Sequence, residues 1–240
     1  MSVPSAVLLE VRGARISYRH DQMVVDGIDL SVDAGELVAL LGHNGSGKST
    51  LMRAAFDLVP LRSGSIALRG VQSRRAEARP HALLLAGNEQ LPTFLSGREL
   101  IQLLATMYAV QVDEPRIDEL FALYGMAGRQ DDLIEDYSHG MRKKTQLVAA
   151  LLLRRPLTVV DETLNGIDRE ALVLAEEDLA GLTDGGAVIL CSHELPMLER
   201  VATRVVVLDG GRIVADLPMS HVLDGDGGLA GVLDEHALDR

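Results

Sequence analysis

The chain has 240 residues, of which 47% are hydrophobic and 24% charged, a composition typical of a globular protein with a sizeable core. Its net charge of −12 argues against a nucleic-acid partner, because such binding depends on Lys and Arg side chains that neutralise phosphates. The single cysteine, Cys191, excludes an internal disulfide. We see no signal-peptide pattern, and no apolar run reaches the ~20 residues that a membrane span needs. We therefore expect a cytoplasmic protein.

Short β-type segments come first in the chain. "AVLLEVRG", "ARISY" and "GIDLSV" are rich in apolar residues, and the last of them alternates with a period of two through Ile28, Leu30 and Val32. Farther along, "SIALRG" predicts an exposed strand and "HALLLAG" a buried one. The first third of the chain is therefore expected to be mainly strands, with one helix among them.

The stretch "LVALLGHNGSGKSTLMRAAF" predicts a buried strand, a glycine-rich loop and a helix. Its spacing fits the phosphate-loop pattern G-x-x-x-x-G-K-[ST]. Glycines let successive backbone N–H groups approach an anion, and the helix that follows points its positive end at the same place. In this pattern Lys48 reaches the β- and γ-phosphate oxygens, and Ser49 binds Mg²⁺. The predicted nucleoside-triphosphate loop consists of Gly42, His43, Asn44, Gly45, Ser46, Gly47, Lys48, Ser49 and Thr50.

Helical periodicity begins at "LPTFLSGREL", where Leu100, Leu103, Leu104 and Met107 recur at helical spacing. A further helix starts at Ser138, and strands then alternate with helices through "LTVVDE", "GAVILCSH" and the hairpin "RVVVLDGGRIV". This pattern predicts one α/β domain with a mainly parallel sheet. Its parts are a core over residues 1–91 and 137–220, an inserted helical lobe over 92–136, and an acidic, glycine-rich tail over 221–240, either a short helix or partly disordered.

Two predicted core strands end in side chains suited to phosphate chemistry. "LTVVDE" presents Asp161 and Glu162, and "VILCSHEL" presents His193. Ligands of open α/β sheets bind at the carboxyl ends of the strands. Asp161 is suited to hold Mg²⁺ through carboxylate oxygens, and Glu162 to orient or deprotonate an attacking water. His193 is placed to meet the γ-phosphate.

A second candidate anion site lies at the start of the helix in "EDYSHGMRKKTQLVAALLL". Ser138 is well placed as its N-cap, and Gly140 leaves the neighbouring N–H groups accessible. Two phosphate-binding helix ends in one chain suggest that two molecules share each nucleotide.

Together these motifs resemble the ATP-binding cassette (ABC) ATPases over nearly the whole chain. "GHNGSGKST" resembles the Walker A loop, and "LTVVDE" resembles Walker B with Glu162 as catalytic glutamate. "LNGID" resembles the D-loop with Asp168 as its aspartate, His193 matches the switch histidine, and Tyr18 matches the residue that stacks on adenine. The resemblance implies ATP and Mg²⁺ as cofactors. It also implies a P-loop NTPase core with a small antiparallel β subdomain, and a head-to-tail dimer.

"YSHGMRKK" resembles a variant of the family signature, usually written LSGGQ. Tyr137, His139 and Met141 replace leucine, the first glycine and glutamine, whereas Ser138 and Gly140 remain. Variants of the form Y-S-x-G-M resemble a subset of the family found in bacterial exporter-type systems.

The glutamine of the family's Q-loop has no clear equivalent. Its position falls near Gly87 or Asn88 in "LAGNEQLP", and Gln90 lies a few residues late. The role of the Q-loop glutamine falls to Asn88, to Gln90 or to neither. Asn88 is the candidate metal ligand of this segment.

The resemblance implies an ATPase subunit that closes with a second ABC subunit, identical or different, around Mg²⁺–ATP and drives a permease carried on separate chains. Exporter function is favoured, the transported substrate is not specified, and membrane contact is expected only through the permease. The alternative is a soluble ABC-type ATPase that acts on a macromolecular assembly. A GTPase is disfavoured because the base-reading N-K-x-D motif is missing, and a kinase because it needs no Ser138 helix end.

Overall fold

The computed structural model describes residues 6–19, 22–87 and 91–236. A six-stranded sheet forms its centre, in the order β10-β9-β3-β8-β7-β6. The strands from β9 to β6 run parallel to one another, and the β9–β10 hairpin adds the antiparallel edge. This arrangement confirms the predicted mainly parallel α/β core. Its strands are β3 (Leu37–Leu41), β6 (Ala82–Ala86), β7 (Leu157–Asp161), β8 (Ala187–Cys191), β9 (Arg204–Asp209) and β10 (Arg212–Pro218).

A second, four-stranded sheet is antiparallel, as the family resemblance implies. The two strands expected before Tyr18 form one long strand, whose register with β2 shifts around Gly13. The strand expected to be exposed at "SIALRG" is buried instead: Ile66 and Leu68 join the apolar cluster that includes α1, and Ala67 between them is 6% exposed. The sheet consists of β1 (Val7–Arg19), β2 (Gln22–Asp33), β4 (Ser63–Leu68) and β5 (Val71–Gln72), in the order β2-β1-β4-β5.

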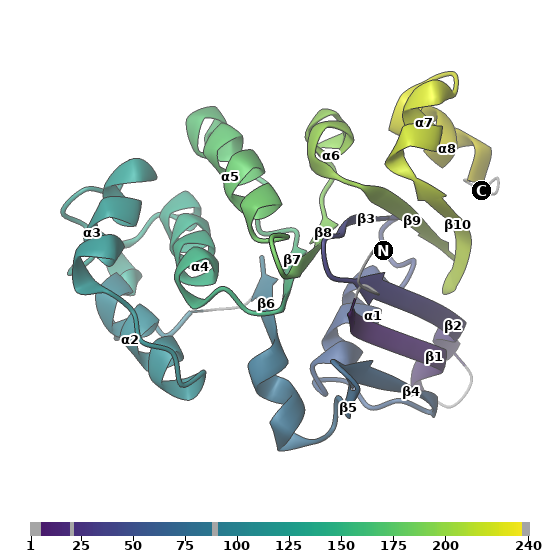
Figure 1. The fold of residues 1–240 in the computed structure, drawn as a ribbon, viewed down its shortest axis with the longest axis horizontal. Coiled ribbons are helices and arrows are strands. Elements are labelled where there is room, and N and C mark those ends of the chain that lie inside the picture. Colours follow the sequence, from purple (N-terminus) through teal and green to yellow (C-terminus); the bar gives the residue numbers. More distant parts are fainter. Residues whose placement is uncertain (1–5, 20–21, 88–90, 237–240) are drawn as a thin grey trace, which may run out of the picture.

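The central sheet separates two apolar clusters. Leu37, Ala39 and Leu41 of β3 face one cluster, whereas Val38 and Leu40 face the other. Since both faces are covered, β3 is apolar at every position, as expected for a parallel strand. α1 (Lys48–Ala55) and the four-stranded sheet cover one face, and α4 (His139–Leu153), α5 (Arg169–Gly181) and α6 (Leu195–Val201) cover the other (Figure 1).

Helices α2 (Gly97–Met107) and α3 (Glu114–Leu123) lie within the predicted helical lobe. A capping box starts α2: the Ser96 hydroxyl accepts a hydrogen bond from the Glu99 N–H, and the Glu99 carboxylate accepts one from the Ser96 N–H. Arg98 then joins α2 to α3 through ion pairs with Glu114 and Asp118. These contacts make the lobe a compact unit against α4.

The end of the described chain is helical, so the first of the two alternatives for the tail is closer to the structure. α7 (Met219–Asp224) and α8 (Gly228–His236) pack against each other, and Leu229 of α8 is fully buried. The Glu199 carboxylate of α6 accepts a hydrogen bond from the Leu229 N–H at 2.8 Å. This contact fastens the start of α8 to the core.

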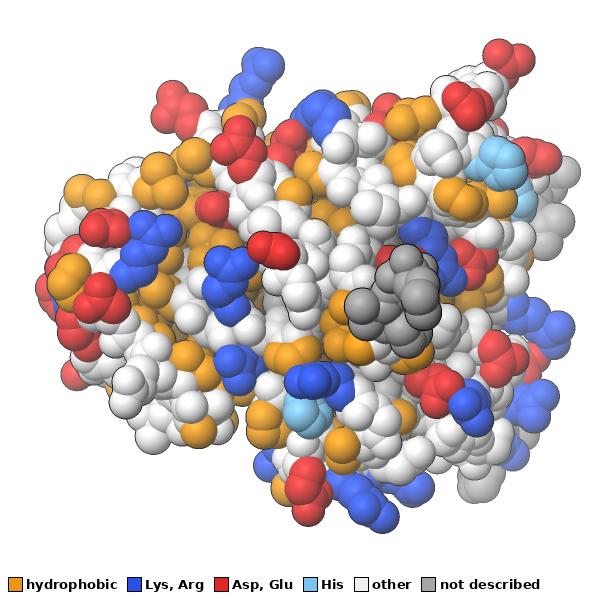
Figure 2. Space-filling model, viewed as in Figure 1, with side chains coloured by type: hydrophobic (Ala, Val, Ile, Leu, Met, Phe, Trp, Pro, Cys, Tyr) orange, Lys and Arg blue, Asp and Glu red, His pale blue; other side chains and the backbone are white. Residues whose placement is uncertain are grey.

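Charged side chains are unevenly spread over the surface. Figure 2 shows basic side chains at the lower edge, over β5 and the 3-10 segment Ala76–His81, where Arg74, Arg75 and Arg79 are exposed. Elsewhere on this face, acidic and basic groups are interspersed. No helix in the described ranges combines the length and apolar character that crossing a bilayer requires.

Candidate nucleotide-binding site

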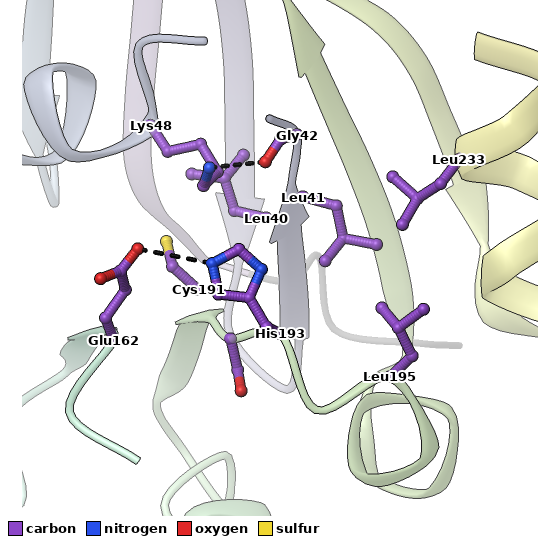
Figure 3. A pocket seen from close by; sticks show the side chains of 10 residues that line it. Leu40, Leu41, Gly42, Lys48, Glu162, Cys191, His193, Leu195 and Leu233 are labelled. Atoms are coloured by element: carbon purple, nitrogen blue, oxygen red, sulfur yellow. Dashed lines mark hydrogen bonds and ion pairs between the residues drawn. The ribbon is translucent and has the colours of Figure 1, made fainter. Parts of the chain in front are cut away.

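Three neighbouring strands of the central sheet deliver the predicted site residues to one edge. β3, β8 and β7 lie side by side, so the loop after β3, the turn after β8 and the end of β7 meet there. Lys48, Glu162 and His193 accordingly line one cavity, which Figure 3 shows with Glu162 and His193 facing each other. The sequence placed these residues on separate segments, and the parallel topology brings them together.

The phosphate loop, residues 42–47, depends on glycine at both ends. Gly42 has φ 143° and Gly47 φ 108°, in the range that favours glycine. A Cβ at Gly42 would lie 2.1 Å from the Leu208 carbonyl oxygen, and one at Gly47 would lie 2.7 Å from that of Val24. Gly47 also precedes α1 without any side-chain cap, so no side chain of the loop takes up the N–H groups at the start of the helix.

Lys48 is 8% exposed and lies over the loop it follows. Its Nζ donates hydrogen bonds to the carbonyl oxygens of Gly42 (2.7 Å) and His43 (3.1 Å). The Ser46 hydroxyl oxygen is buried and has no hydrogen-bond partner. An ammonium group, a buried hydroxyl without a partner and an uncapped helix N-terminus converge, which fits a phosphate group.

Ser49 and Asp161, the two residues predicted to hold a metal ion, lie next to each other. The Ser49 hydroxyl donates a hydrogen bond to an Asp161 carboxylate oxygen at 3.2 Å. Burial raises the pKa of Asp161 above its ordinary value, and the Ser49 hydrogen bond acts against this shift. Both side chains supply the hard oxygen atoms that Mg²⁺ prefers. Among the described residues no group of three or more His, Cys, Asp or Glu side chains could hold a metal, so these two donors would need further oxygens from a ligand or water.

Glu162 and His193 meet across the cavity. His193 Nε2 lies 3.7 Å from Glu162 Oε1, and the Glu162 N–H donates a hydrogen bond to the Cys191 carbonyl oxygen. Glu162 has φ 57°, an unusual value for a residue with a side chain. A backbone held in this conformation turns the carboxylate back toward the phosphate loop instead of continuing the strand.

Tyr18 lies on the other side of the phosphate loop, near the end of β1. Its hydroxyl is 3.1 Å from the Thr50 hydroxyl, and 60% of the residue is exposed. Asn44 and Gly45 line a second cavity with Ser49 and Thr50, and His43 is exposed. An accessible ring beside this cavity is compatible with the stacking role implied for Tyr18.

Ser138 and Gly140 are separate from this group. Ser138 caps α4 by accepting a hydrogen bond from the Met141 N–H at 3.2 Å, as predicted, and it is exposed. Neither residue is among those lining the two cavities beside the phosphate loop. Tyr137, the departure from the usual signature, is buried in the lobe and donates a hydrogen bond to the Arg129 carbonyl oxygen at 2.6 Å. Burial raises its pKa to about 12.

The remaining predicted site residues are Asp168 and the two Q-loop candidates. Asp168 caps α5 by accepting a hydrogen bond from the Ala171 N–H, and it forms an ion pair with Lys144. The two Q-loop candidates, Asn88 and Gln90, lie outside the described residues.

Backbone contacts that sequence reasoning missed complete the site. The Val24 carbonyl oxygen lies against Gly47 and also against Gly211 in the β9–β10 turn, and the Gly211 N–H donates to the Ser46 carbonyl oxygen. Gly87, at the end of β6, donates its N–H to the Asp161 carbonyl oxygen, and a Cβ there would lie 2.7 Å from the Glu162 carbonyl oxygen. The glycines were visible in the sequence, but no residue pattern marks their partners.

Comparison with known proteins places the chain in a family. The ABC transporter family matches residues 25–165. An uncharacterized ABC transporter ATP-binding protein of Bacillus subtilis is 31% identical over 211 residues, covering 86% of this chain and 68% of the relative. The Nod factor export ATP-binding protein I of Cupriavidus metallidurans is 30% identical over 225 residues, covering 91% and 74%. The chain thus spans about 70% of the length of these relatives.

The fold gives the same result. A solved ATP-binding subunit of an ABC transporter superposes with a TM-score of 0.88 at 27% identity, covering 96% of this chain and all of that subunit. Family match, relatives and fold agree with one another. The chain belongs to the ABC transporter family, as an ATP-binding domain and an ATPase.

Proposed function

We propose that this chain hydrolyses Mg²⁺–ATP at an interface between two ABC subunits and thereby drives transport through a separate transmembrane permease. ATP-driven transport follows from the family. The dimer, the metal, the permease and the individual residue roles are our proposal.

The position of Ser138 carries the dimer proposal. Neither Ser138 nor Gly140 is among the residues that line the two cavities beside the phosphate loop, and Ser138 is exposed. A helix N-terminus with free N–H groups is well suited to an anion. A second subunit in head-to-tail orientation would place its Ser138 and Gly140 against the nucleotide held by the first subunit's loop.

Each residue in the cavity then has a physical role. Lys48 neutralises phosphate charge, and the uncapped start of α1 adds backbone donors. Glu162 accepts a proton from the attacking water, and His193, 3.7 Å from it, orients that carboxylate and contacts the terminal phosphate. Tyr18 stacks on the base. Asp168, beside the Ser138 helix end, contributes to the surface between the subunits.

Ser49 and Asp161 would hold the magnesium ion, since they are adjacent oxygen donors at the loop. When bound, the ion neutralises phosphate charge and fixes the phosphate geometry. Asn88 stays a candidate ligand by its position in the sequence alone.

The direction of transport rests on a relative and on the signature. The similar protein of Cupriavidus metallidurans is named a Nod factor export ATP-binding protein, and we extend export to this chain. The permease would hold the chain at the cytoplasmic face of the membrane.

The decisive variant is Glu162→Gln, which keeps size and hydrogen bonding but removes the base. We expect turnover to fall by roughly 10²–10⁴-fold while ATP binding persists, and a dimer to accumulate in Mg²⁺–ATP on size-exclusion chromatography. A variant that hydrolyses ATP at the wild-type rate as a monomer would refute the proposal.

The permease is tested by purifying the tagged chain from solubilised membranes and identifying what binds it. A stoichiometric protein with several membrane spans supports transport. Stoichiometric recovery with a ribosome or another soluble assembly would instead establish the non-transport alternative.

A further inference from the structure

Lysine is rare in this chain and occurs only beside the proposed site. Of its 23 basic residues only three are lysines, Lys48, Lys143 and Lys144, and the other twenty are arginines. Lys48 belongs to the phosphate loop, whereas nothing in the proposed function uses the other two. Both lie on α4, shortly after its Ser138 cap.

Lys143 is buried, at 6% exposure, and its Nζ donates a hydrogen bond to the Asn165 carbonyl oxygen. Asn165 lies in the loop of residues 163–168, which connects Glu162 to α5. Burial lowers the pKa of the Lys143 ammonium group, and the negative charge of Glu162 acts in the opposite direction. The lysine is therefore linked to this loop by a hydrogen bond and to Glu162 by charge.

Lys144 holds the far end of the same loop. Its Nζ lies 2.5 Å from an Asp168 carboxylate oxygen and donates a hydrogen bond to the Tyr124 carbonyl oxygen at 3.0 Å. Asp168 uses its other carboxylate oxygen to cap α5, and the charge and hydrogen bond of Lys144 hold its pKa below the ordinary value. Tyr124 ends α3 of the helical lobe.

The first turn of α4 faces this loop as well. A Cβ at Gly140 would make an ordinary contact, 3.9 Å, with the Gly166 carbonyl oxygen. α4 therefore meets the loop at three successive places, through Gly140, Lys143 and Lys144. A compact ammonium group with three donors suits buried carbonyl oxygens, whereas the planar guanidinium group of arginine suits carboxylates. Lys143 and Lys144 each direct such an ammonium group at a carbonyl oxygen, that of Asn165 and that of Tyr124, and Lys144 also pairs with the Asp168 carboxylate.

We propose that Lys143 and Lys144 are positioning residues that fasten the loop of residues 163–168 to α4 and thereby hold Glu162 at a defined place relative to the Ser138 helix end. The inference rests on the proposed function, because the position of Glu162 affects turnover only if Glu162 is the catalytic base. Neither lysine touches substrate in this arrangement.

The first experiment compares Lys143→Met and Lys144→Met, which keep the aliphatic stems and remove the ammonium groups. The matched control is Arg116→Met, which removes an exposed cation paired with Glu119 on α3. We expect Lys143→Met to lower kcat by roughly ten- to a hundredfold, because small displacements of a catalytic group are costly, and Lys144→Met to lower it less. The KM for ATP should stay within about twofold, since Lys48 and the phosphate loop are unchanged.

A double-mutant cycle separates positioning from general destabilisation. If Lys143 acts through Glu162, then Lys143→Met in a Glu162→Gln background should lower the residual rate by a much smaller factor than in the wild type. Equal factors in both backgrounds would overturn the proposal.

A spectroscopic measurement on folded, full-length protein keeps the test independent of activity. Protein labelled with ¹³C-lysine has only three side-chain lysine signals, which the Met variants assign. We expect the Lys143 signal to shift in Glu162→Gln and to stay in place in Arg116→Met. Wild-type kcat in Lys143→Met together with an unmoved Lys143 signal would refute the linkage while leaving the proposed function intact. Wild-type hydrolysis by Glu162→Gln would refute both.

Discussion

The two candidate anion sites of this chain differ in how they are built. α1 begins at Gly47 with no side-chain cap, and the loop before it is pressed against the Val24 and Leu208 carbonyl oxygens. α4 begins at an exposed Ser138 that caps the helix with its own hydroxyl. The first site is shaped by backbone from distant strands, and the second by one local hydrogen bond.

This contrast indicates that the two sites have different functions. A site held by close packing is preorganised within one subunit, whereas a locally capped, exposed helix end keeps its own stability and is available to a partner. Substitutions in the phosphate loop should therefore impair folding or nucleotide binding directly. Substitutions at the start of α4 should leave the single subunit intact and affect turnover.

The strongest test of this contrast is Lys48→Ala. Its ammonium group is the cation that lies over the loop, so we expect kcat/KM for ATP to fall by about a hundredfold or more. Isothermal titration with ATP should show weakened or lost binding, and thermal unfolding of the nucleotide-free protein should change little. An unchanged titration would remove Lys48 from the site.

Gly42→Ala and Gly140→Ala form a matched pair at the two sites. The first places a methyl group 2.1 Å from the Leu208 carbonyl oxygen at a φ of 143°, so we expect the free energy of unfolding to drop by roughly 2–4 kcal/mol. The second meets nothing closer than 3.9 Å and should leave stability unchanged or raise it by up to about 1 kcal/mol. Urea denaturation measures both, and equal losses would contradict the comparison.

Ser138 substitutions separate capping from anion binding. Ser138→Ala removes the cap on the Met141 N–H and should cost about 1 kcal/mol of stability, together with ATPase activity. Ser138→Asp restores a capping oxygen but adds a negative charge, so we expect stability to recover while activity stays low. If Ser138→Asp recovers both, the hydroxyl serves α4 alone.

Asp161→Asn should have a small effect on the stability of the fold, and the size of this effect should depend on pH. Because burial raises its pKa, folded Asp161 holds its proton more tightly than the unfolded chain, so the ionised carboxylate is destabilising at pH 7. We expect Asn to raise Tm by about 1–3 °C at pH 7. The gain should shrink as the pH falls through the folded-state pKa, while Mg²⁺-dependent hydrolysis is lost. Calorimetry at several pH values provides the measurement, and a gain that grows toward low pH would contradict the burial argument.

Much of the fold and site follows from local sequence. The eight-residue phosphate-loop spacing is specific because the backbone geometry it requires is specific, and the strand ends at Asp161 and His193 lie beside it as parallel topology demands. The Ser138 cap was predictable because capping depends on one residue and the helix after it.

What the sequence did not show depends on contacts between distant segments. The continuity of β1 through Gly13 required its pairing partners, and the burial of β4 required α1. The acidic, glycine-rich composition of the tail left a short helix and partial disorder both open, because the start of α8 is fixed by Glu199 on another helix. The positive φ of Glu162 likewise results from the turn that follows β7, because glutamate itself has no preference for this conformation.

Gly87 has an evolutionary consequence. The space beyond its Cα is filled by the peptide group of Glu162, on a strand more than seventy positions away in the chain. A descendant that acquired even alanine there would have to shift the backbone of the proposed catalytic glutamate. Glycine at position 87 is thus required by the backbone of the neighbouring strand end, where the proposed catalytic glutamate lies.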